Sequence, residues 1–120
     1  MDNFIEDCKR TESLLNGLLL SGDKTRLLHA AFGLSTEAGE FLDQLKKHYF
    51  YDRALDLTNL REELGDLLWY MAIAMDALDT DFPTEMDRVI RKLRVRFPEK
   101  FNPVDANCRD LPAERKELEQ

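Results

Sequence analysis

The sequence predicts an all-α protein that folds as a bundle of about four main helices. Long segments repeat apolar residues at helical spacing, and almost none alternate as strands do. Glycine and proline are few, with five Gly and four Pro among 120 residues, so little interrupts these segments. A chain of this length makes one domain and can bury a core without disulfides or metal.

The first two helices are expected on either side of a break at Ser21-Gly22-Asp23. One covers 3–20, and the other runs over 25–49 with an apolar stripe along one side. The inner side of the first helix consists of Phe4, Ile5, Cys8, Leu15, Leu18 and Leu19. The stripe of the second consists of Leu27, Ala31, Leu34, Ala38, Phe41, Leu45 and Tyr49.

A third helix over 59–78 follows a connection over 50–58. Asn59 can cap it, because Glu62 stands at the position of the capping-box glutamate. Its apolar stripe centres on Leu60, Leu64, Met71 and Leu78. With Trp69 added, the helix is apolar almost all round and needs two partners, which we expect to be the remaining bundle and a second subunit. A base-binding pocket is the alternative surrounding for Trp69.

A fourth helix is expected over 83–96, and Pro98 stops it. The sequence after it is polar and weakly patterned, with one short helix after Pro112. We therefore expect one all-α domain over 1–101 and a polar C-terminal tail over 102–120.

Charge and cysteine usage narrow the partners and the compartment. The chain has 24 acidic and 17 basic residues and a net charge of −7, which disfavours nucleic-acid binding. No apolar run is long enough to span a bilayer, and the first ten residues lack the apolar core of a signal peptide. Cys8 and Cys108 fit no metal-finger spacing, so a reducing, cytoplasmic location is the simplest interpretation, with a long-loop disulfide as the alternative.

Two short patterns each place a pair of carboxylates three residues apart. Glu37 and Glu40 lie in the second helix, and Glu63 and Asp66 lie in the third. On projection at about 100° per residue, both pairs lie to the same side of their apolar stripes. Because the short connection favours antiparallel packing, all four acids should converge. Converging carboxylates repel one another unless a cation neutralises them, and an all-oxygen set suits Mg²⁺ first and Mn²⁺ second.

Glycine stands directly before the second acid of each pair, at Gly39 and Gly65. Glycine is unfavourable inside a helix, so its repeated use predicts that something approaches the backbone closely there. The alternative for the acids is that they are solvated residues on outer helix faces. A di-iron site is disfavoured because neither His29 nor His48 stands three residues after a glutamate.

Basic residues gather at the end of the fourth helix. The group consists of Arg88, Arg91, Lys92, Arg94, Arg96 and Lys100. Interaction with the helix dipole explains some of them, but six are more than capping requires, and such clusters suit phosphate oxygens. The sequence has no P-loop and no Ser/His/Asp or Cys/His signature, so metal-assisted attack of water on a phosphate is the reaction class that remains.

These motifs together resemble a known family, the MazG-like all-α nucleoside triphosphate pyrophosphohydrolases. The matching segments are LSTEAGE at 34–40, REELGDLLWY at 61–70 and KLRVRFP at 92–98. They follow the family order of ExxE, ExxD and a later basic segment, and the resemblance covers about residues 25–101. It implies hydrolysis of a nucleoside or deoxynucleoside triphosphate to the monophosphate and pyrophosphate.

The resemblance also implies roles for particular residues. Glu37, Glu40, Glu63 and Asp66 would hold Mg²⁺, with Mn²⁺ as a substitute, and one of them or Glu62 would orient or deprotonate the attacking water. At the basic positions, Lys92 and Arg96 would contact the phosphates. Helical projection alone places Asn59 and Tyr70 beside the acids as possible substrate contacts.

Relatives assemble as homodimers or homotetramers and serve in nucleotide-pool control or house-cleaning, so the same is expected of this chain. Two other functions remain open from the sequence. One is a catalytically silent regulatory module that binds nucleotide or metal, and the other is a helical protein-interaction protein that uses its apolar third helix.

Overall fold

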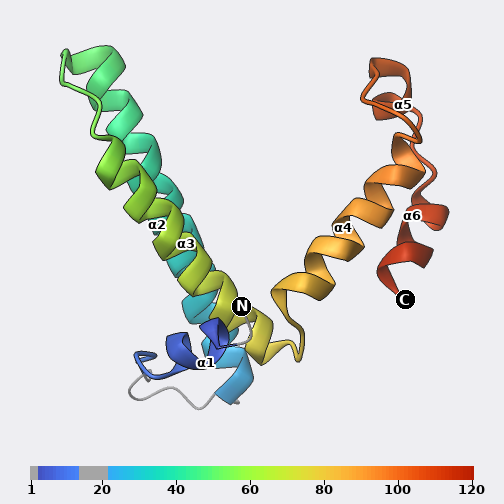
Figure 1. Ribbon diagram of the computed structural model, residues 1–120, viewed down its shortest axis with the longest axis horizontal. Coiled ribbons are helices and arrows are strands. Elements are labelled where there is room, and N and C mark those ends of the chain that lie inside the picture. The colour runs from blue at the N-terminus through green and yellow to red at the C-terminus, as the bar shows by residue number, and fades with distance from the viewer. Residues whose placement is uncertain (1–2, 14–21) are drawn as a thin grey trace. The chain divides into compact units, whose positions relative to one another are not determined.

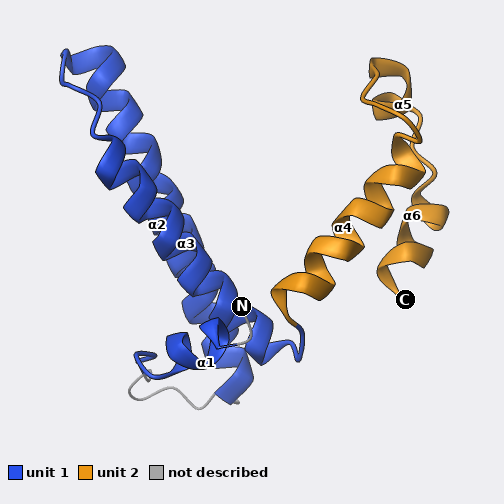
Figure 2. Cartoon of the chain, viewed as in Figure 1, with its two compact units in different colours: residues 1–80 blue, residues 81–120 orange. Residues whose placement is uncertain are grey.

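The computed structural model describes residues 3–13 and 22–120, and within these residues it contains helices and no strands. The helices are α1 (Phe4–Lys9), α2 (Gly22–Tyr51), α3 (Leu57–Ala77), α4 (Phe82–Arg96), α5 (Pro103–Asn107) and α6 (Leu111–Leu118) (Figure 1). The predicted all-α fold class is confirmed. The chain divides into two compact units, residues 1–80 and residues 81–120 (Figure 2).

The first unit is built on a hairpin of the two longest helices. α2 and α3 lie side by side and run antiparallel, joined by residues 52–56 (Figure 1). Directly after the end of α2, Asp52 adopts a positive φ of 53°. Asp56, not Asn59, is the N-cap of α3, because its extended backbone lets its carboxylate accept from the Asn59 backbone N–H at 3.0 Å. The predicted cap was therefore wrong by three residues, and Asn59 lies inside the first turn, with its side chain available for another role.

Small residues form the contact between α2 and α3. Ala30 and Gly33 are the buried residues of α2, and α3 buries Ala72, Ile73 and one acid, Glu63. The stripe predicted for α3 was the wrong face, because Leu64 and Leu78 are 51% and 62% exposed. Since α3 is apolar on both sides, periodicity alone did not select the face with the small side chains, which allows the closer approach to α2.

The close backbone approach predicted at Gly39 and Gly65 occurs instead at Gly33. Nothing in the described chain lies within 4 Å of a Cβ built at Gly39 or Gly65. A Cβ at Gly33 would collide with the ring of Tyr70 on α3. Gly33 is therefore the position where the hairpin requires glycine, because an aromatic ring packs directly on the α2 backbone.

The N-terminal segment, residues 3–13, packs on the lower end of the hairpin in Figure 1. The helix predicted over 3–20 ends at Lys9, and residues 14–20 of that prediction lie outside the described residues. The chain turns after α1 through hydrogen bonds from the Thr11 and Glu12 amides to the carbonyls of Cys8 and Lys9. This turn brings the Glu12 carboxylate to Arg26, where a 2.6 Å ion pair forms.

The second unit, residues 81–120, packs α6 against α4. Asp81 caps α4 by accepting from the Thr84 amide at 2.8 Å. The tail predicted to carry one short helix instead contains α5 and α6, each with a capping side chain, from Asn102 and Asp110, and a proline in its first turn. The division into a domain over 1–101 and a tail over 102–120 stays a prediction.

Two further features concern the membrane and the cysteines. Among the described helices, none is both long and apolar enough to cross a membrane. Cys8 is buried, Cys108 is exposed, and both are free thiols in the structure.

Candidate active site

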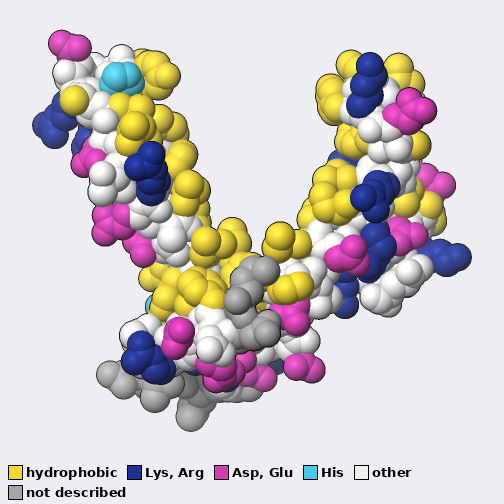
Figure 3. Space-filling model, viewed as in Figure 1, with side chains coloured by type: hydrophobic (Ala, Val, Ile, Leu, Met, Phe, Trp, Pro, Cys, Tyr) yellow, Lys and Arg dark blue, Asp and Glu magenta, His cyan; other side chains and the backbone are white. Residues whose placement is uncertain are grey.

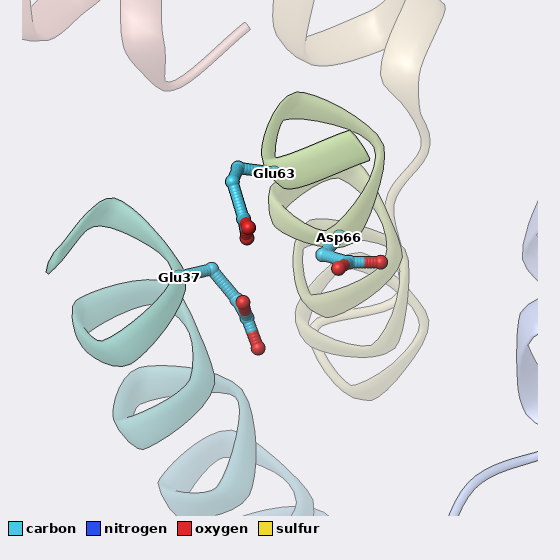
Figure 4. A group of neighbouring side chains, drawn as sticks. All are labelled: Glu37, Glu63 and Asp66. Carbon is cyan, nitrogen blue, oxygen red and sulfur yellow. The ribbon is translucent and has the colours of Figure 1, made fainter. Parts of the chain in front are cut away.

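Three of the predicted acids come together across the helical hairpin. Glu37 of α2 and Glu63 and Asp66 of α3 each offer an oxygen, and these oxygens lie within 4.8 Å of one another. Figure 4 shows the carboxyl groups of Glu37 and Glu63 between the two helices, with Asp66 further along α3. These three residues are called the acidic cluster below. Antiparallel pairing of α2 and α3 produces it, as the spacing of the motifs predicted.

Glu63 is the buried member of the acidic cluster, at 4% exposure. Its Oε1 accepts a hydrogen bond from Asn59 Nδ2 at 2.9 Å. Its Oε2 is buried and has no hydrogen-bond partner in the described part of the chain. A buried carboxylate oxygen without a donor is unfavourable, so the site calls for a cation or a bound donor.

The electrostatics of Glu37 point the same way. Burial raises the pKa of this half-buried carboxyl above its ordinary value. The charges of Glu40 and Asp66 raise it further, and so do a hydrogen bond with Glu63 and the charge of Glu63. The cluster therefore holds negative charge that the surrounding protein does not offset, and a bound cation would reverse the shift.

Glu40, the fourth predicted acid, differs from the other three. It lies on the exposed side of α2 and does not belong to the group of oxygens within 4.8 Å, although its charge reaches Glu37. Its role as a metal ligand stays a prediction.

Asn59 links two neighbouring acids of α3. Its Nδ2 donates to Glu63 Oε1 and, at 3.2 Å, to Oε2 of the exposed Glu62. Its Oδ1 is buried and, like Glu63 Oε2, meets no donor among residues 3–13 and 22–120. The structure shows Asn59 bonded to Glu63, and its predicted role as a substrate contact stays a prediction.

A pocket opens beside the acidic cluster. It has a volume of about 290 Å³ and is lined by Glu37, Asp66, Trp69 and Tyr70. The rings of Trp69 and Tyr70 meet edge to face with their centroids 4.9 Å apart, and His29 of α2 meets the edge of Tyr70 at 5.6 Å. Carboxylates on one side and aromatic rings on the other suit a ligand with a cationic or metal-bound part and a planar part. Trp69 lines this pocket, and its predicted surroundings, a subunit interface or a base-binding pocket, stay predictions.

The basic group on α4 is partly neutralised within its own unit. Arg96 donates through Nε and Nη2 to the buried Glu114 of α6 at 2.8 and 3.0 Å, and Arg109 donates to the same carboxylate. The hydrogen bonds from Arg96, and after them those from Arg109, hold the pKa of Glu114 well below its usual range. The sequence did not reveal this partner, because Glu114 lies 18 residues after Arg96, in the segment predicted to be a polar tail.

Other members of the basic group also have acidic partners. Arg88 pairs with Glu85 at 2.6 Å, and Arg91 pairs with Asp87 and with Glu117. The half-buried Lys92 makes no ion pair within the described residues. The two predicted phosphate contacts are Lys92 and Arg96. Among the described residues, a carboxylate pairs with Arg96 but none pairs with Lys92.

The acidic cluster fits a hard divalent cation. All its donor atoms are oxygens, and two of its carboxylates are at least half-buried. The buried Glu63 Oε2 and Asn59 Oδ1 have no hydrogen-bond donor within the part of the chain that the structure describes. Oxygen-only sets of this kind suit Mg²⁺ or Mn²⁺. Glu37, Glu63 and Asp66 are the residues that would hold such an ion.

The raised pKa of Glu37 makes the stability of the metal-free protein depend on pH. Folded Glu37 holds its proton more tightly than the unfolded chain, so the folded state loses stability as the pH rises from the ordinary value of 4.5 through the raised pKa. We expect Glu37→Gln to remove this loss. Urea unfolding in EDTA between about pH 4 and pH 7 measures the difference in free energy of unfolding between wild type and variant. A constant difference across this range would contradict the assignment.

The part of the chain that carries this site matches a known protein family. The family model described as "MazG nucleotide pyrophosphohydrolase domain" matches residues 27–101, a range that contains the acidic cluster and the pocket. No curated protein and no solved structure matches the chain. The match covers more than half of the chain and agrees with the resemblance carried by its motifs. The chain therefore belongs to the MazG nucleotide pyrophosphohydrolase family.

Proposed function

We propose that this protein hydrolyses nucleoside or deoxynucleoside triphosphates to the monophosphate and pyrophosphate, with Mg²⁺ as cofactor and Mn²⁺ as a substitute. The observation that carries the proposal is the acidic cluster beside a pocket lined by Trp69 and Tyr70. Within the described residues, the buried Oε2 of Glu63 in this cluster has no hydrogen-bond donor. Family membership supports the reaction class. A role in nucleotide-pool control or house-cleaning follows from this reaction.

The chain's own acids have two tasks in this reaction. Glu37, Glu63 and Asp66 hold the cation, with Glu40 as the proposed fourth ligand. When bound, the ion would supply positive charge that stabilises the charge developing on the phosphate oxygens and would favour loss of a proton from the attacking water. Water attacks the α-phosphorus, the bond from that phosphorus to the bridging oxygen breaks, and pyrophosphate leaves. Glu62 or a member of the cluster accepts the proton of the attacking water.

Basic and aromatic residues are proposed to hold the rest of the nucleotide. Lys92 and Arg96 contact the phosphates, and Arg96 uses Nη1, because its Nε and Nη2 are bound to Glu114. Tyr70 and Trp69 contact the nucleoside from the pocket wall.

The experiment that tests the reaction is product analysis with a panel of canonical and modified nucleoside triphosphates. Anion-exchange chromatography should show one monophosphate and one pyrophosphate per substrate, only when Mg²⁺ or Mn²⁺ is present. In ¹⁸O-labelled water the label should enter the monophosphate. Release of single phosphate would refute the reaction, and nucleotide binding without any product would indicate a regulatory module instead.

The exposed apolar face of α3 supports a homo-oligomer, a dimer or tetramer. Hydrophobic side chains gather along the hairpin in Figure 3, and Leu64, Leu68 and Met71 on α3 are 37–51% exposed. A second copy would cover this face and supply the second partner that α3 requires. Size-exclusion chromatography with light scattering measures the mass, and Leu68→Glu should shift it toward the monomer. A monomeric wild type at working concentration would contradict this proposal.

Asn59 should tune the affinity of the site for its metal. Asn59→Leu keeps the branched shape of the side chain but removes the amide that bonds Glu63, so we expect the Mg²⁺ concentration at half-maximal activity to rise by about 10- to 100-fold. Asn107→Leu is the control, because the Asn107 amide donates to the nearby Pro103 carbonyl of α5, far from the acids in sequence. A Mg²⁺ dependence that is unchanged in Asn59→Leu would remove Asn59 from the site.

A further inference from the structure

Trp69, a wall of the pocket, is bound to a part of the chain that lies outside the matched family range. Its indole Nε1–H donates to Thr11 Oγ1 at 3.0 Å, across 58 residues of sequence. Thr11 belongs to the N-terminal segment, residues 3–13, whereas the family match begins at residue 27. The N-terminal segment therefore touches a residue of the pocket that the family pattern alone does not connect with it.

The Thr11 hydroxyl makes two hydrogen bonds, one as donor and one as acceptor. It donates to the carbonyl of Cys8 at 3.1 Å and accepts from Trp69. Cys8 is the buried residue of α1, at 3% exposure, so the group that orients the hydroxyl is itself fixed. With its proton directed to Cys8, the hydroxyl presents a lone pair to the indole N–H.

Ion pairs hold the segment on both sides of Thr11. Lys9 binds Asp76 of α3 at 3.2 Å, and Glu12 binds Arg26 of α2 at 2.6 Å. Arg26 also binds Asp76 at 2.7 Å, so the segment, α2 and α3 share one ionic network. Thr11 is thereby held at a constant position relative to the helix that carries Trp69.

The bond to Thr11 is the polar contact that the described residues give the indole ring. The described ring neighbours of Trp69 are Tyr70, edge to face at 4.9 Å, and His29 at 6.2 Å. Its N–H is the only polar atom of the side chain, and the bond to Thr11 fixes the rotation of the ring. The face that the ring presents to the pocket then depends on Thr11.

We infer that Thr11 is a positioning residue of the nucleotide pocket, which holds the Trp69 indole in the orientation that binds the planar part of the substrate. This inference rests on the proposed function, because the pocket must be the nucleotide site. The residues that form and position the pocket then include residues 8–12, which lie outside the range that the family model matches.

The test compares Thr11→Val, which is isosteric and lacks the hydroxyl, with Thr11→Ser, which keeps it. Trp69 is the only tryptophan of the chain, so its fluorescence reports this one ring. For Thr11→Val we expect a changed emission maximum and a KM raised about three- to tenfold with kcat within about twofold of wild type, as the loss of one hydrogen bond implies. Thr11→Ser should behave as wild type in both measurements. Thermal unfolding of each variant checks that both are folded.

Titration of Trp69 fluorescence with a nucleoside triphosphate analogue that has a non-hydrolysable α,β-methylene bridge, with Mg²⁺ present, separates this inference from the proposed function. A wild-type response that Thr11→Val shifts to higher nucleotide concentration, and Thr11→Ser restores, supports the positioning role. A wild-type response that Thr11→Val leaves unchanged overturns the inference alone. An equal defect in Thr11→Val and Thr11→Ser also overturns it, because the effect would then not follow the hydroxyl. No response and no turnover in wild type would overturn the proposed function together with the inference.

Discussion

Glu63→Gln is expected to lower kcat/KM about a thousandfold or more and to abolish the stabilisation by Mg²⁺. Glutamine keeps the shape of the side chain and the acceptor for Asn59, but it removes the charge of the one cluster acid that is buried. A bound divalent ion contributes several kcal/mol to the transition state of phosphate hydrolysis, and each 1.36 kcal/mol is about tenfold in rate. Steady-state kinetics at saturating Mg²⁺ measures the loss.

Thermal unfolding provides a second test of Glu63→Gln, and this test needs no substrate. Without metal, Glu63→Gln should be at least as stable as wild type, because the neutral amide relieves repulsion with Glu37 and Asp66. With Mg²⁺, the melting temperature of wild type should rise and that of the variant should not. Glu99→Gln is the matched control, since Glu99 is an exposed acid outside the cluster. A variant that keeps full activity and the full Mg²⁺ shift would refute the ligand role.

The convergence of the acids could be predicted from the sequence, although the packing that produces it could not. The spacing of the two motifs and a short connection predicted an antiparallel pair with its acids on one side, and Glu37, Glu63 and Asp66 meet there. The predicted contact through the Leu64 and Leu78 stripe was wrong. Periodicity identifies the apolar faces of a helix, but which face meets a neighbour depends on the fit of side chains across the pair.

Interactions between residues distant in sequence are the part that the sequence did not reveal. The bond of Trp69 to Thr11 and the ion pair of Arg96 with Glu114 each join residues whose positions carry no mutual pattern. The helices of the C-terminal segment were different, because their signals were present. Asn102 before Pro103 and Asp110 shortly before Pro112 are capping side chains followed by proline, the combination that starts a helix.

Gly33→Ala should destabilise the fold and distort the pocket, because the added methyl group occupies the space of the Tyr70 ring. Alanine gains about 1 kcal/mol of helix propensity over glycine, but overpacking at a buried contact costs about 1–3 kcal/mol. The ring cannot move freely, since it meets Trp69 and His29 edge to face. We expect a net loss of up to about 2 kcal/mol in the free energy of unfolding and a marked loss of nucleotide affinity. Urea unfolding and substrate titration measure the two effects.

Gly39→Ala is the matched control, because Gly39 lies in the same helix and an added Cβ meets nothing within 4 Å. The control should raise the free energy of unfolding by about 1 kcal/mol. Gly33→Ala combined with Tyr70→Ala should lose much less stability than the sum of the single changes, because the colliding ring is gone. Strict additivity in this cycle would show that Tyr70 does not pack on Gly33. Activity lost in Gly39→Ala despite higher stability would mean that a group outside the chain, a substrate or a second subunit, approaches α2 at that position, as the repeated glycine first suggested.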